Sequence, residues 1–244
     1  MRSRGRAWAA DAHHVAQERI WDRLLGRQRC PLLPAFLSDP SLAHRPVGEE
    51  LDHIFRIVVG RRLTRNIVGG GHPRRHSLTD FIQRGISDAQ RVLPYVRPHE
   101  TLLEYGGGVG RVGRSIAPHV HRLVCVDVNP LMKEYGPRLS PGVEFRDLGG
   151  LPESGDFDGA YSIAVFFHLT LPEQAEALRY VHRRLKPGGW FLVDLKIGPR
   201  TLGPSVDRRN IAYTALADFR ALYEPLFTAR SVPLFYSGFL MRRK

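Results

Sequence analysis

Cysteine is scarce in this sequence of 244 residues, which contains only Cys30 and Cys125. The two are too far apart in the chain to form the closely spaced pair of a zinc knuckle. Cys125 also lies within a short apolar run that predicts a buried strand. The pattern excludes a disulfide-rich secreted domain, favours a reducing compartment and predicts no metal site.

The sequence also lacks a long apolar run. Its first apolar stretch, Ala7 to Ala10, is interrupted by Asp11. No later stretch reaches the roughly 18 apolar residues that a membrane-spanning helix needs, and the start is not that of a signal peptide. We expect a cytoplasmic protein that is soluble and does not contact a membrane.

Lysine is scarce as well, and the sequence contains only four lysines: Lys133, Lys186, Lys196 and Lys244. The formal net charge of +12 therefore comes almost entirely from arginine. Such a charge suits an anionic partner, such as RNA, a nucleotide-sugar or an acyl carrier. However, the arginines are scattered, as in a GC-rich coding sequence, whereas nucleic-acid surfaces concentrate basic and aromatic residues on one element. Residues 61–65 and 74–76 are the two basic clusters that could form a rim.

One segment stands out against this background. The apolar run at residues 101–105 leads directly into five glycines within residues 106–113. This order predicts a strand, a turn that lets a ligand approach the backbone, and a helix from Arg111 to Pro118 whose first turn offers free N–H groups. A second apolar run, residues 122–127, ends in Asp127. A carboxylate at that position can accept both hydroxyls of a ribose.

Two families use such a turn. The spacing of Gly108, Gly110 and Gly113 matches the dinucleotide fingerprint, with Asp127 about 20 residues on, and would indicate NAD. That match, however, begins two glycines after the strand ends. The stretch from Glu104 to Gly110 begins on the strand itself, with an acid two positions before its first glycine, and resembles motif I of the class I S-adenosylmethionine-dependent methyltransferases. An acid suits that cationic cofactor and would repel a diphosphate.

Further segments resemble this family in the same order along the chain. They comprise a third strand at 143–147, a fourth strand with the loop beyond it at 157–169, a capping box at Thr170 and Glu173 that begins a helix, a fifth strand at 190–194, a helix at 214–222, and two closing strands at 227–232 and 235–243. The resemblance implies a Rossmann-like α/β fold for residues 96–244. It also implies a seven-stranded mixed sheet of order 3-2-1-4-5-7-6, with the seventh strand antiparallel.

The resemblance implies S-adenosyl-L-methionine as the cofactor, with S-adenosyl-L-homocysteine as the product. The glycines would approach its methionine part, Glu104 its ammonium group, Asp127 its ribose, and Asp147 with Leu148 its adenine. The complete set of cofactor-binding candidates is Glu104, Tyr105, Gly106, Gly107, Gly108, Gly110, Asp127, Val128, Asp147, Leu148 and Ile163.

Residues 1–95 match no motif. Apolar residues at helical spacing predict a first helix around Trp8 to Leu24, a second around Leu51 to Val59, and a third from Ser77 to Leu93. The resemblance implies that this segment covers the cofactor and recognises the substrate, while a scaffold or dimer contact is an equal alternative. Gly69 to Gly71 is the candidate hinge.

His168 follows the predicted fourth strand, where cofactor and acceptor meet in this family, and is the candidate general base. Its ordinary pKa of about 6.5 suits that role. The alternative is that His168 only packs beside the cofactor or caps the next helix.

Missing motifs restrict the acceptor. The residues after the fourth strand, Ser162 to Phe166, lack the Asn/Asp-Pro-Pro-aromatic motif of base amino methyltransferases. Neither cysteine is placed for cytosine carbon methylation, no lysine precedes Lys133 for a ribose-methyltransferase tetrad, and no acid lies between Asp158 and Glu173 for a metal-assisted site. A small-molecule or carbohydrate hydroxyl, on an acceptor that could be anionic, is the favoured acceptor. The alternatives are an RNA methyltransferase, an NAD(P)-dependent reductase and a non-catalytic cofactor-binding subunit, each as a monomer or homodimer.

Overall fold

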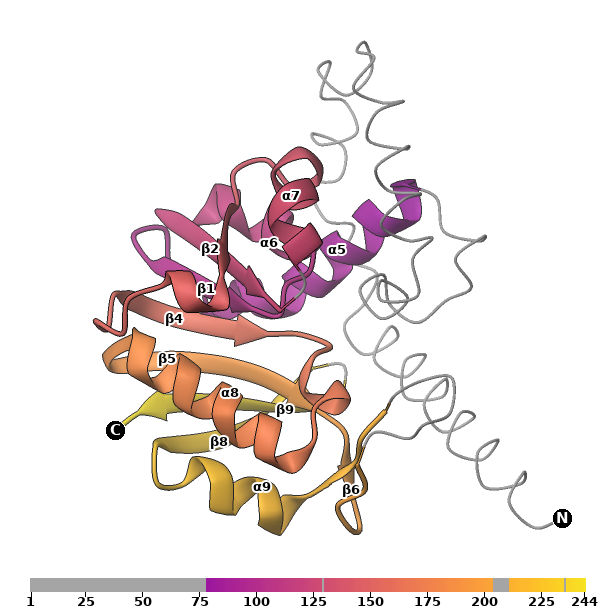
Figure 1. Ribbon diagram of the computed structural model, residues 1–244, viewed down its shortest axis with the longest axis vertical. Helices are drawn as coiled ribbons and strands as arrows, with labels where there is room; N and C mark the ends of the chain where they lie inside the picture. The colour runs from indigo at the N-terminus through magenta and orange to yellow at the C-terminus, as the bar shows by residue number, and fades with distance from the viewer. Residues whose placement is uncertain (1–77, 129, 204–210, 235) are drawn as a thin grey trace, which may run out of the picture. The chain divides into compact units, whose positions relative to one another are not determined.

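The computed structural model describes residues 78–128, 130–203, 211–234 and 236–244, which all belong to one compact unit (Figure 1). The first two predicted helices, the candidate hinge and both basic clusters lie outside the described residues. Among the described residues, no helix is long and apolar enough to span a membrane.

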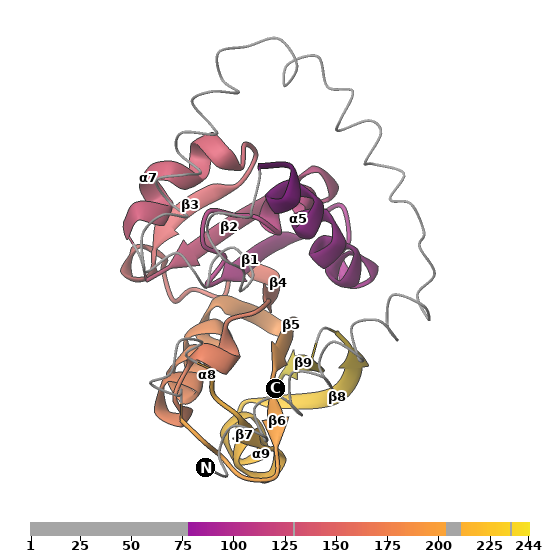
Figure 2. The ribbon, with the colours of Figure 1, turned by 90° about the vertical axis from the view of Figure 1, so that its right-hand side faces the viewer.

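The core of the molecule is one seven-stranded sheet. Its strands are β1 (Thr101–Tyr105), β2 (Arg122–Asp127), β3 (Glu144–Asp147), β4 (Phe157–Ser162), β5 (Leu185–Leu195), β8 (Phe227–Pro233) and β9 (Ser237–Arg243). They are ordered β3-β2-β1-β4-β5-β9-β8, and β9 is antiparallel to both of its neighbours (Figure 2). Counted within this sheet alone, the order is 3-2-1-4-5-7-6, which confirms the predicted fold class.

A two-stranded sheet of β6 (Ile197–Gly198) and β7 (Thr214–Ala215) was not predicted. Its strands are only two residues long, which is too short for the alternation of polar and apolar residues that marks a strand in sequence. It lies just beyond the carboxyl end of β5, where the backbone N–H of Thr214 also donates to the carbonyl of Lys196 at 2.9 Å.

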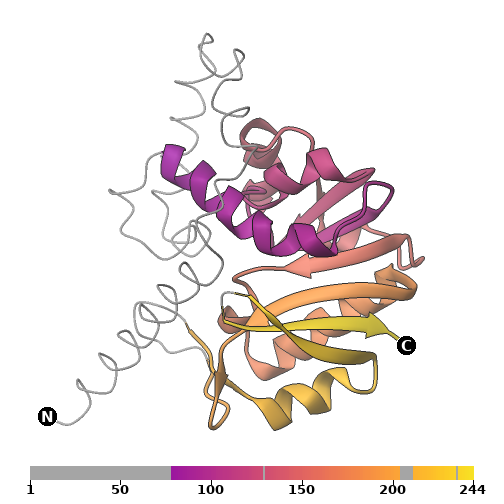
Figure 3. The same cartoon turned by 180° about the vertical axis from the view of Figure 1, so that it is seen from behind.

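Helices cover both faces of the sheet, as a largely parallel sheet requires. On one face lie α5 (Leu78–Val92), α6 (Gly113–Ile116) and α7 (Pro130–Leu139), and on the other lie α8 (Leu171–Arg184) and α9 (Leu216–Tyr223) (Figures 1 and 3). The helices pack on the sheet through two apolar clusters, one on each face. One cluster contains Ala89 and Ile116, and the other contains Leu178 and Phe219. The central strands are buried from both sides, which explains their continuous apolar runs.

The third predicted helix is present as α5, followed by the 3₁₀ turn η3 (Leu93–Tyr95). Ala89 and Val92 of this helix are buried in the same cluster as Leu102 of β1. The last helix of the predicted N-terminal segment thus packs directly on the sheet, while the boundary near residue 95 stays a prediction.

The predicted helix from Arg111 to Pro118 is shorter than expected. Regular helix covers only Gly113–Ile116, and a 3₁₀ turn, η4 (Ala117–His119), follows. Gly110 has a φ of +75°, which a right-handed helix does not accommodate, and Pro118 has no N–H to continue the helical hydrogen bonds. The glycine turn therefore occupies more of this segment than its sequence suggested.

Candidate active site

The parallel strands β1, β2, β4 and β5 all end at one edge of the sheet, where open α/β sheets bind their ligands. Every sequence-predicted site residue lies at this edge or in the segments just beyond it. The edge combines three parts: the glycine loop after β1 (residues 106–110), the acids at the ends of β2 and β3, and the loop after β4 that leads to His168.

The glycine loop adopts a backbone conformation that residues with a side chain rarely adopt. Gly106, Gly108 and Gly110 have φ values of +73°, +60° and +75°. A Cβ atom on Gly106 would lie 2.7 Å from Cγ2 of Val165, so the loop after β4 packs directly on this glycine. The backbone N–H of Gly106 donates to the carbonyl of Val126 at 2.8 Å, which fixes the loop to the end of β2.

Glu104 lies beneath the glycine loop and is only 3% exposed. A Cβ atom on Gly107 would come within 2.5 Å of its Cδ, so the glycine makes room for this side chain. Burial raises the pKa of Glu104 to about 8, although the Arg111 guanidinium, the Tyr161 hydroxyl and the Gly113 N–H oppose the shift. The carboxyl group therefore supports the loop from the sheet side.

Arg111 connects the glycine loop to α5 through a buried ion pair with Asp88. The two elements approach closely, because a Cβ atom on Gly85 of α5 would overlap the carbonyl oxygen of Arg111. Sequence reasoning missed this contact, since the partners are 23 residues apart. It makes α5 part of the site's framework.

The acids at the ends of β2 and β3 lie opposite one another, because Asp127 and Asp147 are paired in register. Asp127 Oδ2 accepts a hydrogen bond from the Gly108 N–H at 3.0 Å. Asp147 forms a half-exposed ion pair with Lys133 of α7. The two carboxylates thus lie at the ends of neighbouring strands, and that of Asp127 is bonded to the glycine loop.

The residues that follow these two acids differ in exposure and bonding. Val128 is 80% exposed, and the Leu148 carbonyl accepts a hydrogen bond from the Tyr180 hydroxyl at 2.8 Å.

The loop after β4 is tied to both neighbouring strands. The Ser162 hydroxyl donates to the Tyr105 carbonyl at 2.9 Å, and the Ala164 N–H donates to Asp194 Oδ1 of β5 at 2.8 Å. Ile163 is buried and packs in the cluster beneath α5. These contacts fix the segment that separates the glycine loop from His168.

His168 ends the 3₁₀ turn η6 (Phe166–His168) and is half-buried. Its backbone N–H donates to the Val165 carbonyl at 2.8 Å, and its ring centroid lies 4.3 Å from that of Phe167. Since Val165 also packs on Gly106, the histidine is connected to the glycine loop through a single residue.

A positively charged aromatic cluster borders this histidine, and sequence reasoning missed it. The Lys196 ammonium lies 4.6 Å from the ring centroid of Tyr236, 5.6 Å from that of Phe167 and 5.8 Å from that of Tyr213. Cation–π contacts of this kind orient a lysine. The three rings come from distant parts of the chain, so spacing alone could not have revealed them.

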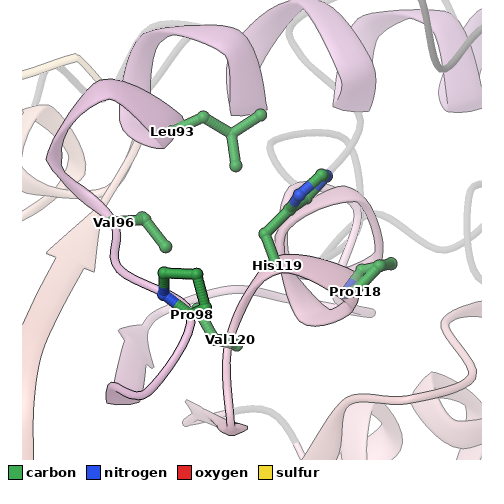
Figure 4. Close-up of a pocket in the computed structure, with 6 residues that line it drawn as sticks. All are labelled: Leu93, Val96, Pro98, Pro118, His119 and Val120. Atoms are coloured by element: carbon green, nitrogen blue, oxygen red, sulfur yellow. The ribbon is translucent and has the colours of Figure 1, made fainter.

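A shallow pocket of about 390 Å³ lies at the opposite edge of the sheet, before β1 and β2. Figure 4 shows its lining residues, which are Leu93, Val96, Pro98, Pro118, His119 and Val120. None of them belongs to the predicted site, and the pocket is separate from the glycine loop. Within the described part of the chain, no group of three or more His, Cys, Asp or Glu side chains could hold a metal ion.

The arrangement of a glycine turn, an acid beneath it and acids on the next two strands matches a known protein family. Residues 103–193 match the family model described as a methyltransferase domain. This part of the chain is thus a methyltransferase domain, and it resembles the class I S-adenosylmethionine-dependent methyltransferases. No curated protein sequence matches it significantly.

Solved methyltransferase structures share the fold at low sequence identity. Magnesium protoporphyrin IX methyltransferase from Synechocystis PCC 6803 is 18% identical with a TM-score of 0.54, over 81% of this chain and 100% of that one. An amino pentose methyltransferase from Micromonospora echinaspora is 15% identical with a TM-score of 0.51, over 70% and 93% of the two chains. The 1,6-didemethyltoxoflavin-N1-methyltransferase of Burkholderia thailandensis is 21% identical with a TM-score of 0.50, over 79% and 90%.

The site fits S-adenosylmethionine, the cofactor of the family that the chain resembles. Glycine at residues 106, 108 and 110 permits the left-handed turn after β1, and a turn of this kind allows a ligand to approach the backbone closely. The Asp127 carboxylate accepts a hydrogen bond from this turn, and its negative charge suits a cation and disfavours the diphosphate of NAD.

Proposed function

We propose that this methyltransferase transfers a methyl group to a hydroxyl of a small molecule or glycan, with His168 as general base. The observation that carries the proposal is the short connection between the backbone of His168 and the glycine loop. His168 bonds to Val165, and Val165 packs on Gly106. A base on this side of the glycine loop would face the acceptor when the cofactor is bound.

The proposed cofactor contacts follow from the strand ends. The backbone of Gly106, Gly107, Gly108 and Gly110 would line the methionine part. Glu104 would lie beneath the loop near the ammonium group, and the positive charge of that group would favour ionisation of the Glu104 carboxyl. Asp127 would accept the ribose hydroxyls, with Val128 beside it. Asp147 and Leu148 would border the adenine, and Tyr105 and Ile163 would complete the wall on the side of β4.

When bound, S-adenosylmethionine supplies a methyl group already activated by its sulfonium. The protein's own residues need to orient the acceptor, exclude water and remove the hydroxyl proton. His168 would accept that proton, while Phe167 fixes the imidazole from one side. The buried loop after β4 would keep the reacting groups in place.

The Lys196 cluster supports an anionic acceptor. Phe167 contacts His168, and the Lys196 ammonium lies near the rings of Phe167, Tyr213 and Tyr236. This part of the site thus offers both positive charge and planar apolar surface. An acceptor that carries a carboxylate or phosphate next to its hydroxyl would meet complementary charge here. We also propose that residues 1–95 form the lid and substrate-recognition segment.

Product formation with matched acceptor pairs tests the reaction. S-Adenosylhomocysteine release is measured with phenols against anilines, and with sugars against the corresponding amino sugars, each with and without a carboxylate. Turnover of hydroxyl acceptors supports the proposal, and turnover of the amines alone contradicts it. Calorimetry with S-adenosylhomocysteine against NADH and NADPH is the cofactor control, and methylation of total RNA would favour the nucleic-acid alternative.

A further inference from the structure

Asp194 is a fully buried acid at the end of β5, and neither the reaction nor the cofactor contacts proposed above use it. Burying a carboxylate costs several kcal/mol unless its environment compensates. One oxygen accepts the hydrogen bond from the Ala164 N–H at 2.8 Å. The other, Oδ2, has no hydrogen-bond partner among the described residues. The bond from the Ala164 N–H is the one side-chain hydrogen bond that joins Asp194 to another described residue, and it therefore points to the role of this acid.

The electrostatic surroundings of Asp194 come from α5. The pKa of Asp194 is raised to about 7, mainly by burial and also by the charge of Asp88, while the N–H groups of Ala164 and of Asp194 itself and the Arg91 guanidinium oppose the increase. The acid is therefore poorly stabilised as an anion. Its bond to Ala164 does not depend on the charge, because a protonated carboxyl group still offers a carbonyl oxygen as acceptor.

Ala164 has an unusual backbone conformation. Its φ is +62°, and it is the only non-glycine residue with a positive φ in the described ranges. The left-handed conformation costs an alanine roughly 1–2 kcal/mol, so other interactions must favour it. The hydrogen bond from Ala164 to Asp194 is such an interaction.

The conformation of Ala164 determines where its neighbour lies. Val165 packs so closely on Gly106 that a Cβ atom there would be 2.7 Å away. The Val165 carbonyl also accepts the backbone hydrogen bond of His168 at 2.8 Å. A change at Ala164 would therefore move both the support of the glycine loop and the histidine.

We infer that Asp194 is a positioning residue, which holds Ala164 in its left-handed conformation and thereby keeps Val165 against the cofactor loop. The inference rests on the proposed cofactor contacts of the glycine loop and is independent of the acceptor. Asp194 does not touch the reacting groups. It acts through Ala164 and Val165.

A rescue experiment tests this role. Asp194→Ala removes the acceptor and should raise the dissociation constant of S-adenosylhomocysteine about tenfold, measured by calorimetry. Ala164→Gly in the same chain should restore most of the affinity, because glycine adopts a positive φ without cost. Asp194→Asn keeps an acceptor oxygen and should bind nearly as the unchanged protein does. Val193→Ala, a truncation at the neighbouring buried position of β5, is the matched control and should leave the affinity nearly unchanged.

Hydrogen exchange without any ligand gives a second readout. Asp194→Ala should accelerate exchange in residues 163–168 and leave β8 and β9 unchanged, and this holds whether or not the proposed cofactor contacts are correct. If exchange accelerates throughout the sheet, or if Ala164→Gly restores nothing, Asp194 is a general core residue and the inference is wrong. Should Asp194→Ala fail to fold, folding of the Asp194→Ala/Ala164→Gly protein supports the role, and failure of both overturns it.

Discussion

Asp127 and Gly108 are joined by a hydrogen bond in which the glycine N–H donates to the carboxylate Oδ2 at 3.0 Å. The acid that we assign to the ribose therefore also holds the middle of the glycine loop. One side chain couples two parts of the cofactor site, so its loss should affect the geometry of the loop as well as direct binding.

Asp127→Ala should weaken binding of S-adenosylhomocysteine by roughly 1.5–3 kcal/mol, as expected for losing charge-assisted hydrogen bonds. Calorimetry measures the change. Asp156→Ala, which removes an exposed surface acid that bonds only to nearby Ser154, is the control and should bind normally. Unchanged affinity in Asp127→Ala would contradict the assignment of this acid to the ribose.

Gly106→Ala and Gly188→Ala form a matched pair, because the two glycines have φ values of +73° and +72°. A Cβ atom at Gly188 meets nothing within 4 Å, whereas at Gly106 it meets Val165. Gly188→Ala should cost about 1–2 kcal/mol of unfolding free energy and leave cofactor affinity intact. Gly106→Ala should cost about 1–3 kcal/mol more and also weaken cofactor binding.

Urea unfolding measures the loss of stability in both variants, and calorimetry measures their cofactor affinity. Together they separate backbone strain at the substituted residue from displacement of the loop after β4. Equal losses in the two proteins would mean that Val165 yields easily. In that case the contact between the two loops would not set the geometry of the site.

The buried Glu104 predicts a pH-dependent stability. Its pKa is about 8 in the folded protein against an ordinary 4.5, so the unfolded chain releases the proton first. The stabilising contribution is complete below about pH 4.5 and is lost as the pH rises through about 8. Between these limits, the free energy of unfolding should fall by about 1.4 kcal/mol per pH unit through this group.

Glu104→Gln should remove this part of the slope, which urea unfolding at pH 5 to 8 measures. The slope of Glu104→Gln is compared with that of the unchanged protein. The buried Asp194 also makes the free energy of unfolding fall with pH, and this contribution is the same in both proteins. Identical slopes would show that Glu104 is ionised in the folded state and that its place beneath the loop is wrong.

The sequence was sufficient for the features that depend on neighbours along the chain. Leu102 and Leu103 predicted a buried strand, the glycines after it predicted a turn, and Thr170 with Glu173 predicted the start of α8. The Glu173 carboxylate indeed accepts the Thr170 N–H at 2.7 Å. Apolar runs, glycine spacing and capping residues are all local signals.

Contacts between distant residues could not be predicted in this way. Asp194 bonds to a residue 30 positions away, and its burial follows only from the order of the strands. That Glu104 lies near the ammonium group of the cofactor stays a prediction. The space that Gly107 leaves beneath the loop for the Glu104 side chain becomes visible only when the backbone is in place.

His168→Ala tests the chemistry itself. If the imidazole removes the acceptor proton, kcat should fall by about 10²–10⁴-fold with little change in affinity for S-adenosylhomocysteine. His121→Ala, at an exposed histidine just before β2, is the control and should retain full activity. The rate of the unchanged enzyme should rise with pH around the ordinary histidine pKa of about 6.5, and the variant should lose this limb.

The two observables distinguish a base from a packing residue. A histidine that only supports Phe167 would change KM or cofactor affinity when it is removed, because the loop after β4 would relax toward Gly106. Removing such a histidine would leave the rise of the rate with pH unchanged, since a different residue would be the group that loses its proton. Near-native turnover with an unchanged limb would therefore assign proton removal to another residue, or would mean that the acceptor is acidic enough to react without a base.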